Sequence, residues 1–370
     1  MSKTLKIVLG VLVIVIIIGI VAVAKNKTSE TNNSEVIKVG VIAPLSSYMS
    51  EFGDATRNGF LLAQKEAING KKVQFIFEDS VYDPKKAISA YDKLATIDKV
   101  DLIVDWGAAT TQALASVVNR YDIPFVSISA VINAPSQSDK TVRFFERPDT
   151  FASKVWEHLR KLGLKNIAIL KTQNYWLNSV YEQQVLQAKA GESVVLVDDV
   201  TSFNDMDFRT AVSKIKNSKT KYDAVGVYLG SGQIGQFYKQ SSELGLKTVT
   251  FGTDFFENQS DIDTAGTAIN GAFYPQYDVT PEFKAAYEKE YKNQSQIVYA
   301  GLAYDFANIL MNSKDITSGK TALAHLKTLN NTPGVIGSYT YKVNATDSDK
   351  YMQIPVHIKE VRNSKIQTLY

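Results

Sequence analysis

The sequence has no cysteine and only three histidines among its 370 residues. Without cysteine the chain cannot form a disulfide, a thiolate nucleophile, a thiolate metal site or a lipid-modified N-terminal cysteine. His158, His325 and His357 stand alone, with no H-x-x-x-H pair and no G-x-S-x-G turn in the sequence. We therefore expect no metal, no other cofactor and no enzymatic activity, although an acid pair that forms only in three dimensions stays open.

A large charge of one sign is also missing. The 41 Lys and Arg residues nearly balance the 38 Asp and Glu residues, and the formal net charge at pH 7 is +3. A mixed surface of this kind provides no field for a polyanion, so we expect no nucleic-acid partner. The chain is long enough for two domains, since about 150 residues per domain is the usual expectation.

One long hydrophobic run is present, at the N-terminus. Residues Ile7–Ala24 carry no charge, follow two lysines, and are nearly as long as the ~20 residues that cross ~30 Å of hydrocarbon. This length favours a retained transmembrane anchor within residues 1–24, whereas the small residues that end at Ala24 have the form of a signal cleavage site. Both alternatives export the rest of the chain, so we expect an extracytoplasmic protein, anchored to the cell membrane or released by cleavage near Ala24. The polar residues 25–35 are typical of a flexible linker.

From Val36 onward, short apolar and β-branched runs alternate with amphipathic stretches, which is typical of β-α units that feed a parallel sheet. The alternation pauses around Arg143–Thr150 and then restarts, so we expect two α/β lobes. The expected bounds are 36–145 for the first lobe, completed by about 278–335, and 148–275 for the second lobe, completed by about 338–370.

Ligands of open α/β sheets bind beyond the carboxyl ends of the strands, where strand-to-helix turns offer free N–H groups. The turn "DWGAATTQ" has three small residues, Gly107, Ala108 and Ala109, that let a ligand approach backbone amides. Thr110 and Thr111 then add hydroxyls as a helix begins. This composition suits a carboxylate or another oxyanion, although ordinary helix capping also explains the threonines.

A second turn, "GSGQIG", contains Gly230, Gly232 and Gly235 in the G-x-G-x-x-G spacing of a dinucleotide cradle. It follows an apolar run, and Asp254 lies close to the ~20-residue offset of a ribose-binding acid. Against this interpretation, no clear strand-helix-strand continuation follows Asp254, and the leader exports the chain away from cytoplasmic nicotinamide cofactors. The alternative is that these glycines let the backbone come close to another ligand.

Seven stretches stand out together by their order and spacing: IKVGVIAPLS, FGDATRNGFLLA, YDPKKAISAYDKL, GAATTQALASVVNRYDIPFVS, KNIAIL, DFRTAVSKIK and GQFYKQSSELGLKT. Between about Ile37 and Leu310 the chain thereby resembles the periplasmic-binding-protein type 1 family, in its branched-chain amino-acid (Leu/Ile/Val) receptor branch of ABC importers. The resemblance implies two Rossmann-like lobes with parallel sheets, joined by three crossovers, that close on a ligand. It also implies an ABC transporter permease as partner and a small-molecule ligand, an amino acid in the first place.

The same resemblance implies roles for residues of the first lobe. In the family, the turn that matches Ala108–Thr111 presents a Ser and backbone amides to the ligand α-carboxylate. Here the Ser is replaced by Ala108, so the contact would depend on backbone N–H groups, including that of Ala109, and on Thr110. Phe52 matches an aromatic residue of the first turn.

A further turn of the first lobe, from Ser129 through Ala130 to Val131, matches a family Ala-Thr pair that binds the α-amino group. Ala130 is kept, whereas the Thr is replaced by Val131. Because hydroxyls are missing at both Ala108 and Val131, a standard aliphatic amino acid is not the only candidate. A cationic, amide or aromatic ligand stays open.

In the second lobe, Asp254 falls where amino-acid receptors of the family place a Glu for the ligand ammonium. Tyr175 matches an aromatic residue that covers the ligand. Gly230 and Ser231 occupy the place of a Tyr, which would enlarge that wall of the cleft. The glycines are then expected to shape the cleft wall, without holding a pyrophosphate.

Three hypotheses follow for the function. The first is an extracytoplasmic solute-binding protein of an ABC importer that captures a small polar metabolite and performs no chemistry on it. The second is an NAD-dependent oxidoreductase that uses the Gly230–Gly235 loop. The third is the ligand-binding module of a sensor, which would need a separate signalling partner.

Overall fold

The computed structural model describes residues 36–67, 73–128 and 138–370, and Ile37–Tyr370 form one structural unit. The expected anchor and linker, residues 1–24 and 25–35, lie outside the described residues. Within the described ranges, none of the helices combines the length and the apolar character that crossing a membrane requires.

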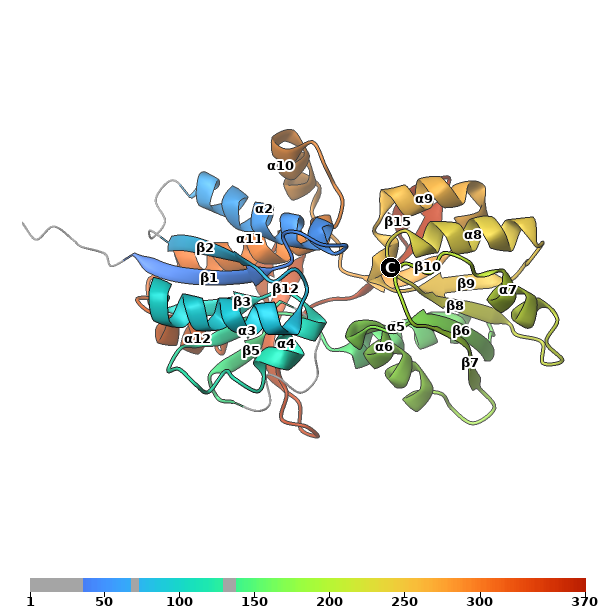
Figure 1. Cartoon of the computed structure of the whole chain (residues 1–370), viewed down its shortest axis with the longest axis horizontal. Helices are drawn as coiled ribbons and strands as arrows, with labels where there is room; N and C mark the ends of the chain where they lie inside the picture. Colours follow the sequence, from blue (N-terminus) through green and yellow to red (C-terminus); the bar gives the residue numbers. More distant parts are fainter. Residues whose placement is uncertain (1–35, 68–72, 129–137) are drawn as a thin grey trace, which may run out of the picture. The chain divides into compact units, whose positions relative to one another are not determined.

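The first lobe is built on an eight-stranded sheet in the described part of the chain (Figure 1). The first five strands and one strand from late in the chain pair in parallel, and two further late strands extend the far edge with antiparallel pairing. In spatial order the strands are β11 (Thr332–Gly334), β12 (Gly337–Val343), β13 (Lys350–Gln353), β5 (Thr141–Arg143), β4 (Phe125–Ser127), β3 (Leu102–Asp105), β1 (Ile37–Ala43) and β2 (Val73–Asp79).

The second lobe has a seven-stranded sheet, again counted over the described residues. Five strands are parallel, and the last two strands of the chain pair antiparallel at one edge. In spatial order they are β15 (Lys365–Thr368), β14 (His357–Arg362), β10 (Phe273–Gln276), β9 (Val249–Gly252), β8 (Ala224–Tyr228), β6 (Asn166–Thr172) and β7 (Ser193–Val200).

Helices supply the crossover connections that parallel strands require. Several begin at an Asp or Asn whose side chain accepts backbone N–H groups of the first turn, as at Asp83, Asn174 and Asn258. The α-helices are α2 (Ser50–Glu66), α3 (Pro84–Lys93), α4 (Ala108–Leu114), α5 (Pro148–Lys161), α6 (Tyr175–Leu186), α7 (Arg209–Lys216), α8 (Gln233–Glu243), α9 (Gln259–Ala265), α10 (Pro281–Tyr291), α11 (Ile297–Asn312) and α12 (Gly319–Leu326). In the described part of the chain, a π-helical turn (Leu94–Asp98) and two 3-10 turns (Asp254–Phe256 and Gly266–Ile269) accompany these α-helices.

Helices α2 and α11 lie side by side over the first sheet (Figure 1). Gly59 on α2 allows this approach, because a Cβ at that position would come 2.1 Å from the carbonyl oxygen of Ala300 on α11. The close packing brings Phe52, near the start of α2, next to Tyr299, near the start of α11, with ring centroids 5.2 Å apart. Two residues that are far apart in the sequence thus meet at the edge of the first lobe.

The chain passes between the lobes three times, through residues 144–147, 277–280 and 354–356. Glu146, in the first crossover, contacts the other two. Its backbone N–H donates to the Tyr277 hydroxyl at 2.9 Å, and its Oε2 accepts from the backbone N–H of Ile354 at 3.0 Å. Glu146 is buried, and burial raises the pKa of its carboxyl to about 7. The three connections are therefore tied together at one residue, through its backbone N–H and its carboxyl.

Two features of the fold differ from the expectation. The two-lobed α/β architecture is confirmed, but both sheets are mixed, because antiparallel strands extend the parallel part of each. In addition, β12 and β13 join the first sheet, although residues from about 338 onward were expected to complete the second lobe. Alternation of apolar residues marks such segments as strands, but it does not specify which sheet edge they extend.

Candidate functional site

A small cavity of about 30 Å³ lies where the strand-to-helix turns of the two lobes meet. The first lobe contributes residues that follow β1, β2 and β3, and the second lobe contributes residues that follow β6 and β9. This is the region beyond the carboxyl ends of parallel strands, where open α/β sheets bind ligands. The lining residues are Met49, Phe52, Tyr82, Trp106, Gly107, Ala108, Phe145, Asn174, Trp176, Asp254, Phe255 and Tyr299.

Asp254 is the acidic residue among the described lining residues and is only 1% exposed. Its Oδ1 accepts a hydrogen bond from the indole N–H of Trp176 at 2.5 Å, and its Oδ2 accepts one from the hydroxyl of Tyr299 at 2.5 Å. Among the described residues no Lys, Arg or His forms an ion pair with it. Burial raises the pKa of Asp254, and the two hydrogen bonds oppose that shift by stabilising the charged form. A positive charge in the cavity would do the same more strongly.

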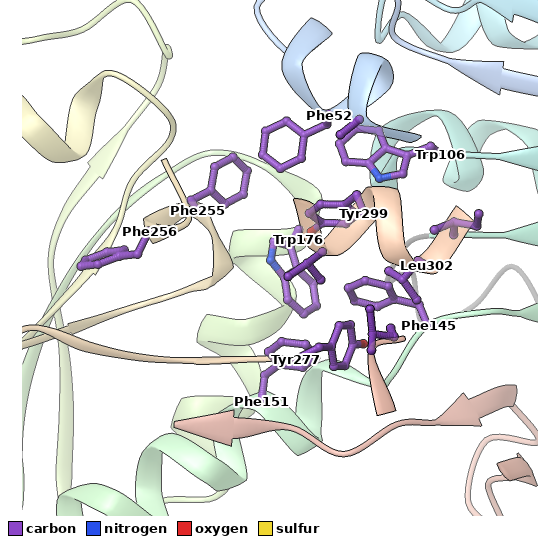
Figure 2. Packing of buried hydrophobic residues seen from close by; sticks show 14 of the residues in the cluster. Phe52, Trp106, Phe145, Phe151, Trp176, Phe255, Phe256, Tyr277, Tyr299 and Leu302 are labelled. Carbon is purple, nitrogen blue, oxygen red and sulfur yellow. The ribbon is translucent and has the colours of Figure 1, made fainter. Parts of the chain in front are cut away.

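Aromatic rings make up most of the wall around this carboxyl. Phe52 stacks on Trp106 with centroids 5.0 Å apart and ring planes inclined by 30°, and Tyr299 meets both rings edge-on (Figure 2). Phe255, next to Asp254 in the chain, lies 5.4 Å from Phe52. Rings of both lobes therefore pack against one another at the site.

Two polar groups of the lining complete the site. Asn174 begins α6 by accepting the N–H of Trp176 at 2.8 Å, and its Nδ2 lies 3.4 Å from the hydroxyl of Tyr82 on the first lobe. The indole N–H of Trp106 is buried and has no hydrogen-bond partner among the described residues. A buried N–H without a partner costs free energy, so an acceptor on a ligand would find a ready donor there.

The structure brings three of the expected site residues to the cavity: Phe52, Ala108 and Asp254. Ala109 is partly buried and does not line it. The Thr110 hydroxyl is directed into the first lobe, where it donates to Asp105 at 2.9 Å.

Asp105 is held by hydrogen bonds within the first lobe. Its Oδ2 also accepts the hydroxyl of Thr111 at 2.6 Å, and burial raises the pKa of the carboxyl to about 7. The two threonine hydroxyls therefore satisfy a buried acid at the end of β3. Asp105 does not line the cavity.

The remaining expected residues lie elsewhere. Tyr175 is 53% exposed and does not line the cavity; its neighbour Trp176 does. Ser231 also lies outside the lining, and its hydroxyl donates to Glu51 on α2. Ser129 and Ala130 belong to residues 129–137, which lie outside the described residues.

The glycine turn after β8 has its amides occupied by an acid of the chain itself. The backbone N–H of Gly232 donates to Asp261 Oδ2 at 2.8 Å, and that of Gly235 donates to Asp261 Oδ1 at 2.7 Å. A Cβ at Gly230 would come 2.1 Å from the ring of Phe203. The amides that would hold a pyrophosphate thus already bind a carboxylate, and the glycines serve close packing. The described residues also contain no group of three or more acids and histidines that could hold a metal ion.

Sequence reasoning missed several residues of the lining, chiefly Trp176, Tyr299 and Phe255. For Trp176 a signal existed, because Asn174 is a strong helix N-cap and places the next residues at the start of a helix. Phe255 adjoins the expected Asp254. Tyr299 had no such signal, since it belongs to a late helix that was expected only to complete the lobe.

Two α/β lobes with three crossovers, enclosing a cavity at the ends of their strands, define a two-lobed ligand-binding protein. The chain belongs to the periplasmic binding protein family, which matches residues 36–364. The family expected from the sequence is thereby confirmed, and the protein is a solute-binding protein.

Individual relatives agree with this assignment. The Leu/Ile/Val-binding protein of Escherichia coli (strain K12) is 25% identical over 265 residues, covering 68% of this chain and 71% of the relative. The Leucine-specific-binding protein of Salmonella typhimurium (strain LT2) is 24% identical over 286 residues, covering 74% and 76%.

Solved structures share the fold. The branched-chain amino acid transporter substrate binding protein LivJ from Streptococcus pneumoniae, in complex with isoleucine, has a TM-score of 0.76 at 20% identity and covers 90% of this chain and 98% of that chain. An ABC transporter solute binding protein from R. palustris, in complex with benzoate, has a TM-score of 0.74 at 20% identity and covers 90% and 95%.

Proposed function

We propose that the chain is the extracytoplasmic solute-binding component of an ABC importer and that it binds a small ammonium-bearing metabolite, in the first place an amino acid, between its lobes. The relatives that support this proposal are named for binding leucine, isoleucine and valine. Because the cavity is lined from both lobes, a ligand there contacts both only in the closed form and stabilises it by that difference in affinity. A permease would then receive the closed, loaded protein.

The observation that carries the proposal is the environment of Asp254. Its carboxyl is buried in the cavity between neutral donors, without a cationic partner in the described part of the chain. An unpaired buried charge costs several kcal/mol, and a ligand ammonium would supply the missing partner. A ligand whose only charge is a carboxylate, such as the benzoate bound by the R. palustris protein, would be repelled by Asp254.

The test is a binding panel on the full-length chain, kept in mild detergent because of the apolar run Ile7–Ala24. Amino acids, their amides, benzoate and NAD are titrated by isothermal calorimetry. We expect an ammonium compound to bind and Asp254→Asn to weaken it by about 30-fold or more, since one partner of a buried charge pair is removed. Asp263→Asn, an exposed acid on α9, is the control and should bind like the parent. Binding of NAD alone, or a ligand unaffected by Asp254→Asn, would overturn the proposal.

We also propose that the run Ile7–Ala24 is retained as a membrane anchor. Its length and the two lysines before it support this proposal. The chain expressed in a bacterial host should stay in the membrane fraction after alkaline carbonate washing, with Lys3 and Lys6 still present by mass spectrometry. A mature chain that begins near Lys25 and appears in the soluble exported fraction would refute retention.

A further inference from the structure

Among the described lining residues, few side chains besides Asp254 offer a hydrogen-bond acceptor. The other lining side chains with an oxygen acceptor are Asn174, Tyr82 and Tyr299. The Oδ1 of Asn174 already accepts two backbone N–H groups of α6, and its Nδ2 faces the Tyr82 hydroxyl. Asp254 already accepts one donor on each oxygen. A primary ammonium group carries three N–H donors, and apart from the remaining lone pairs of Asp254 the described side chains of this lining offer few acceptors for them.

Aromatic rings, in contrast, are abundant in the described lining. Seven of the twelve described lining residues are aromatic, and they come from both lobes and from the first crossover. Phe52, Trp106 and Tyr299 pack together, with centroids 5.0–5.4 Å apart, and Figure 2 shows the three rings close to one another. Aromatic faces attract cations, and a quaternary ammonium is recognised in this way without any hydrogen bond. A lining of aromatic rings around one buried carboxylate is suited to a quaternary ammonium group.

We propose that the ligand of this site is a compact N-methylated ammonium compound, whose methyl groups lie against Phe52, Trp106 and Tyr299 and whose charge is balanced by Asp254. This inference rests on the proposed function and narrows its ligand class. The small cavity volume limits the head group to a compact one, and the lobes must part slightly to admit it.

The Trp106 indole N–H indicates what the other end of the ligand carries. This N–H is buried without a partner among the described residues, while Asp254 accepts from the different indole of Trp176. A ligand carboxylate can accept from Trp106 if a short spacer keeps it away from Asp254. The combination corresponds to a small betaine, with a methylated ammonium at Asp254 and a carboxylate at Trp106.

A methylation series tests this inference on the full-length chain. Glycine, N-methylglycine, N,N-dimethylglycine and N,N,N-trimethylglycine share one carboxylate and differ only in the ammonium group. We expect the affinity to rise along the series, with the trimethyl compound binding at least about 100-fold more tightly than glycine. Choline should likewise bind more tightly than ethanolamine. Choline carries a hydroxyl where trimethylglycine carries a carboxylate, so the parent should bind choline more weakly than trimethylglycine. This difference in affinity should be small in Trp106→Phe.

Two variants on the same helix separate ring recognition from general packing. Phe52→Leu removes a ring of the cavity and should weaken trimethylglycine binding about tenfold. Phe60→Leu also removes a buried ring from α2, but one that packs against Phe75 inside the lobe, and it should leave the affinity unchanged. Thermal unfolding shows whether both variants are folded.

The possible failures are distinguishable. A primary amino acid that binds, is lost in Asp254→Asn and gains nothing from methylation would overturn this inference and leave the proposed function standing. Equal effects of Phe52→Leu and Phe60→Leu would overturn the role of the rings. Absence of binding for every amine and amino acid by the folded chain would overturn both proposals.

Discussion

The hydroxyl of Ser231, in the second lobe, donates a hydrogen bond of 2.6 Å to the carboxylate of Glu51 on α2 of the first lobe. Asn258 of the second lobe lies 3.3 Å from the same oxygen of Glu51. Neither Glu51 nor Ser231 lines the cavity, so the lobes are joined at this carboxylate independently of a ligand contact. We infer that Glu51 stabilises the closed arrangement.

Ser231→Ala should therefore shift the chain toward the open form. One hydrogen bond to a partly exposed carboxylate contributes about 1 kcal/mol, so the ligand affinity should fall roughly fivefold. Ser295→Ala is the matched control, because Ser295 also donates to Glu51, at 3.0 Å, but lies in the same lobe as Glu51. Calorimetry measures the ligand affinity, and small-angle scattering measures the shift toward the open form. Equal losses of affinity in both variants would show that Glu51 does not act across the lobes.

Trp176 and Tyr175 are adjacent in the chain but differ in exposure and in contact with Asp254. Trp176→Ala should abolish measurable binding, because it removes a donor of the buried carboxyl and a ring of the cavity. Tyr175→Ala should leave the affinity within about twofold, since surface substitutions usually have small effects. A titration of both variants checks this. A large loss in Tyr175→Ala would mean that this residue turns into the site when a ligand binds.

The raised pKa of Glu146 makes folding stability depend on pH. Its carboxyl has a pKa of about 7 in the folded chain, against an ordinary value of 4.5, so the folded state holds the proton more tightly. Below pH 4.5 the carboxyl is protonated in both the folded and the unfolded chain, so no stability is lost. As the pH rises from there to about 7, the unfolded state ionises first and stability falls by about 3 kcal/mol, after which the loss stays constant.

Glu146→Gln should flatten this dependence, because the side chain no longer titrates. Urea unfolding between about pH 5 and pH 7 measures the slope, which is independent of any constant loss from the altered hydrogen bonds to Arg147 and Ile354. Asp105, whose pKa is also raised to about 7, leaves part of the slope in the variant. If stability depended on pH as steeply in Glu146→Gln as in the parent, Glu146 would not be the source of this pH dependence.

Asp261 should contribute to stability through the glycine turn. Asp261→Asn leaves one acceptor for the N–H groups of Gly232 and Gly235 and places an amide N–H₂ against the other, so unfolding should become easier by about 1–3 kcal/mol. Asp263→Asn, exposed on the same helix, should cost almost nothing. Urea unfolding compares them. If Asp261→Asn gained NAD affinity without losing stability, the turn would have to be reconsidered as a nucleotide site.

Much of the architecture was accessible from sequence patterns. Apolar runs of strand length alternate with amphipathic stretches, and the pause around Arg143–Thr150 marks the first passage between the lobes, at residues 144–147. Turn residues at the ends of strands also pointed to the site, because parallel strands of a sheet end at a common edge. Ala108 was singled out in such a turn, whereas the family resemblance pointed to Phe52 and Asp254; all three line the cavity.

Other features depend on contacts that no local pattern encodes. Successive residues of a helix point about 100° apart, so a shift of one position decides that Trp176 and not Tyr175 enters the cavity. Tyr299 reaches Asp254 only because α11 packs on α2, a contact between segments far apart in the chain. The edge that β12 and β13 extend is likewise a matter of tertiary pairing.

The sequence by itself determined the repertoire: no thiol chemistry, an apolar N-terminal run, two series of β-α units and an acid after the β9 strand. Tertiary structure alone decided that this acid is enclosed by rings from both lobes and that Asp261 occupies the glycine amides. The physical reason is that local periodicity specifies which side of an element is apolar, whereas the partner that covers it is selected by packing across the whole chain.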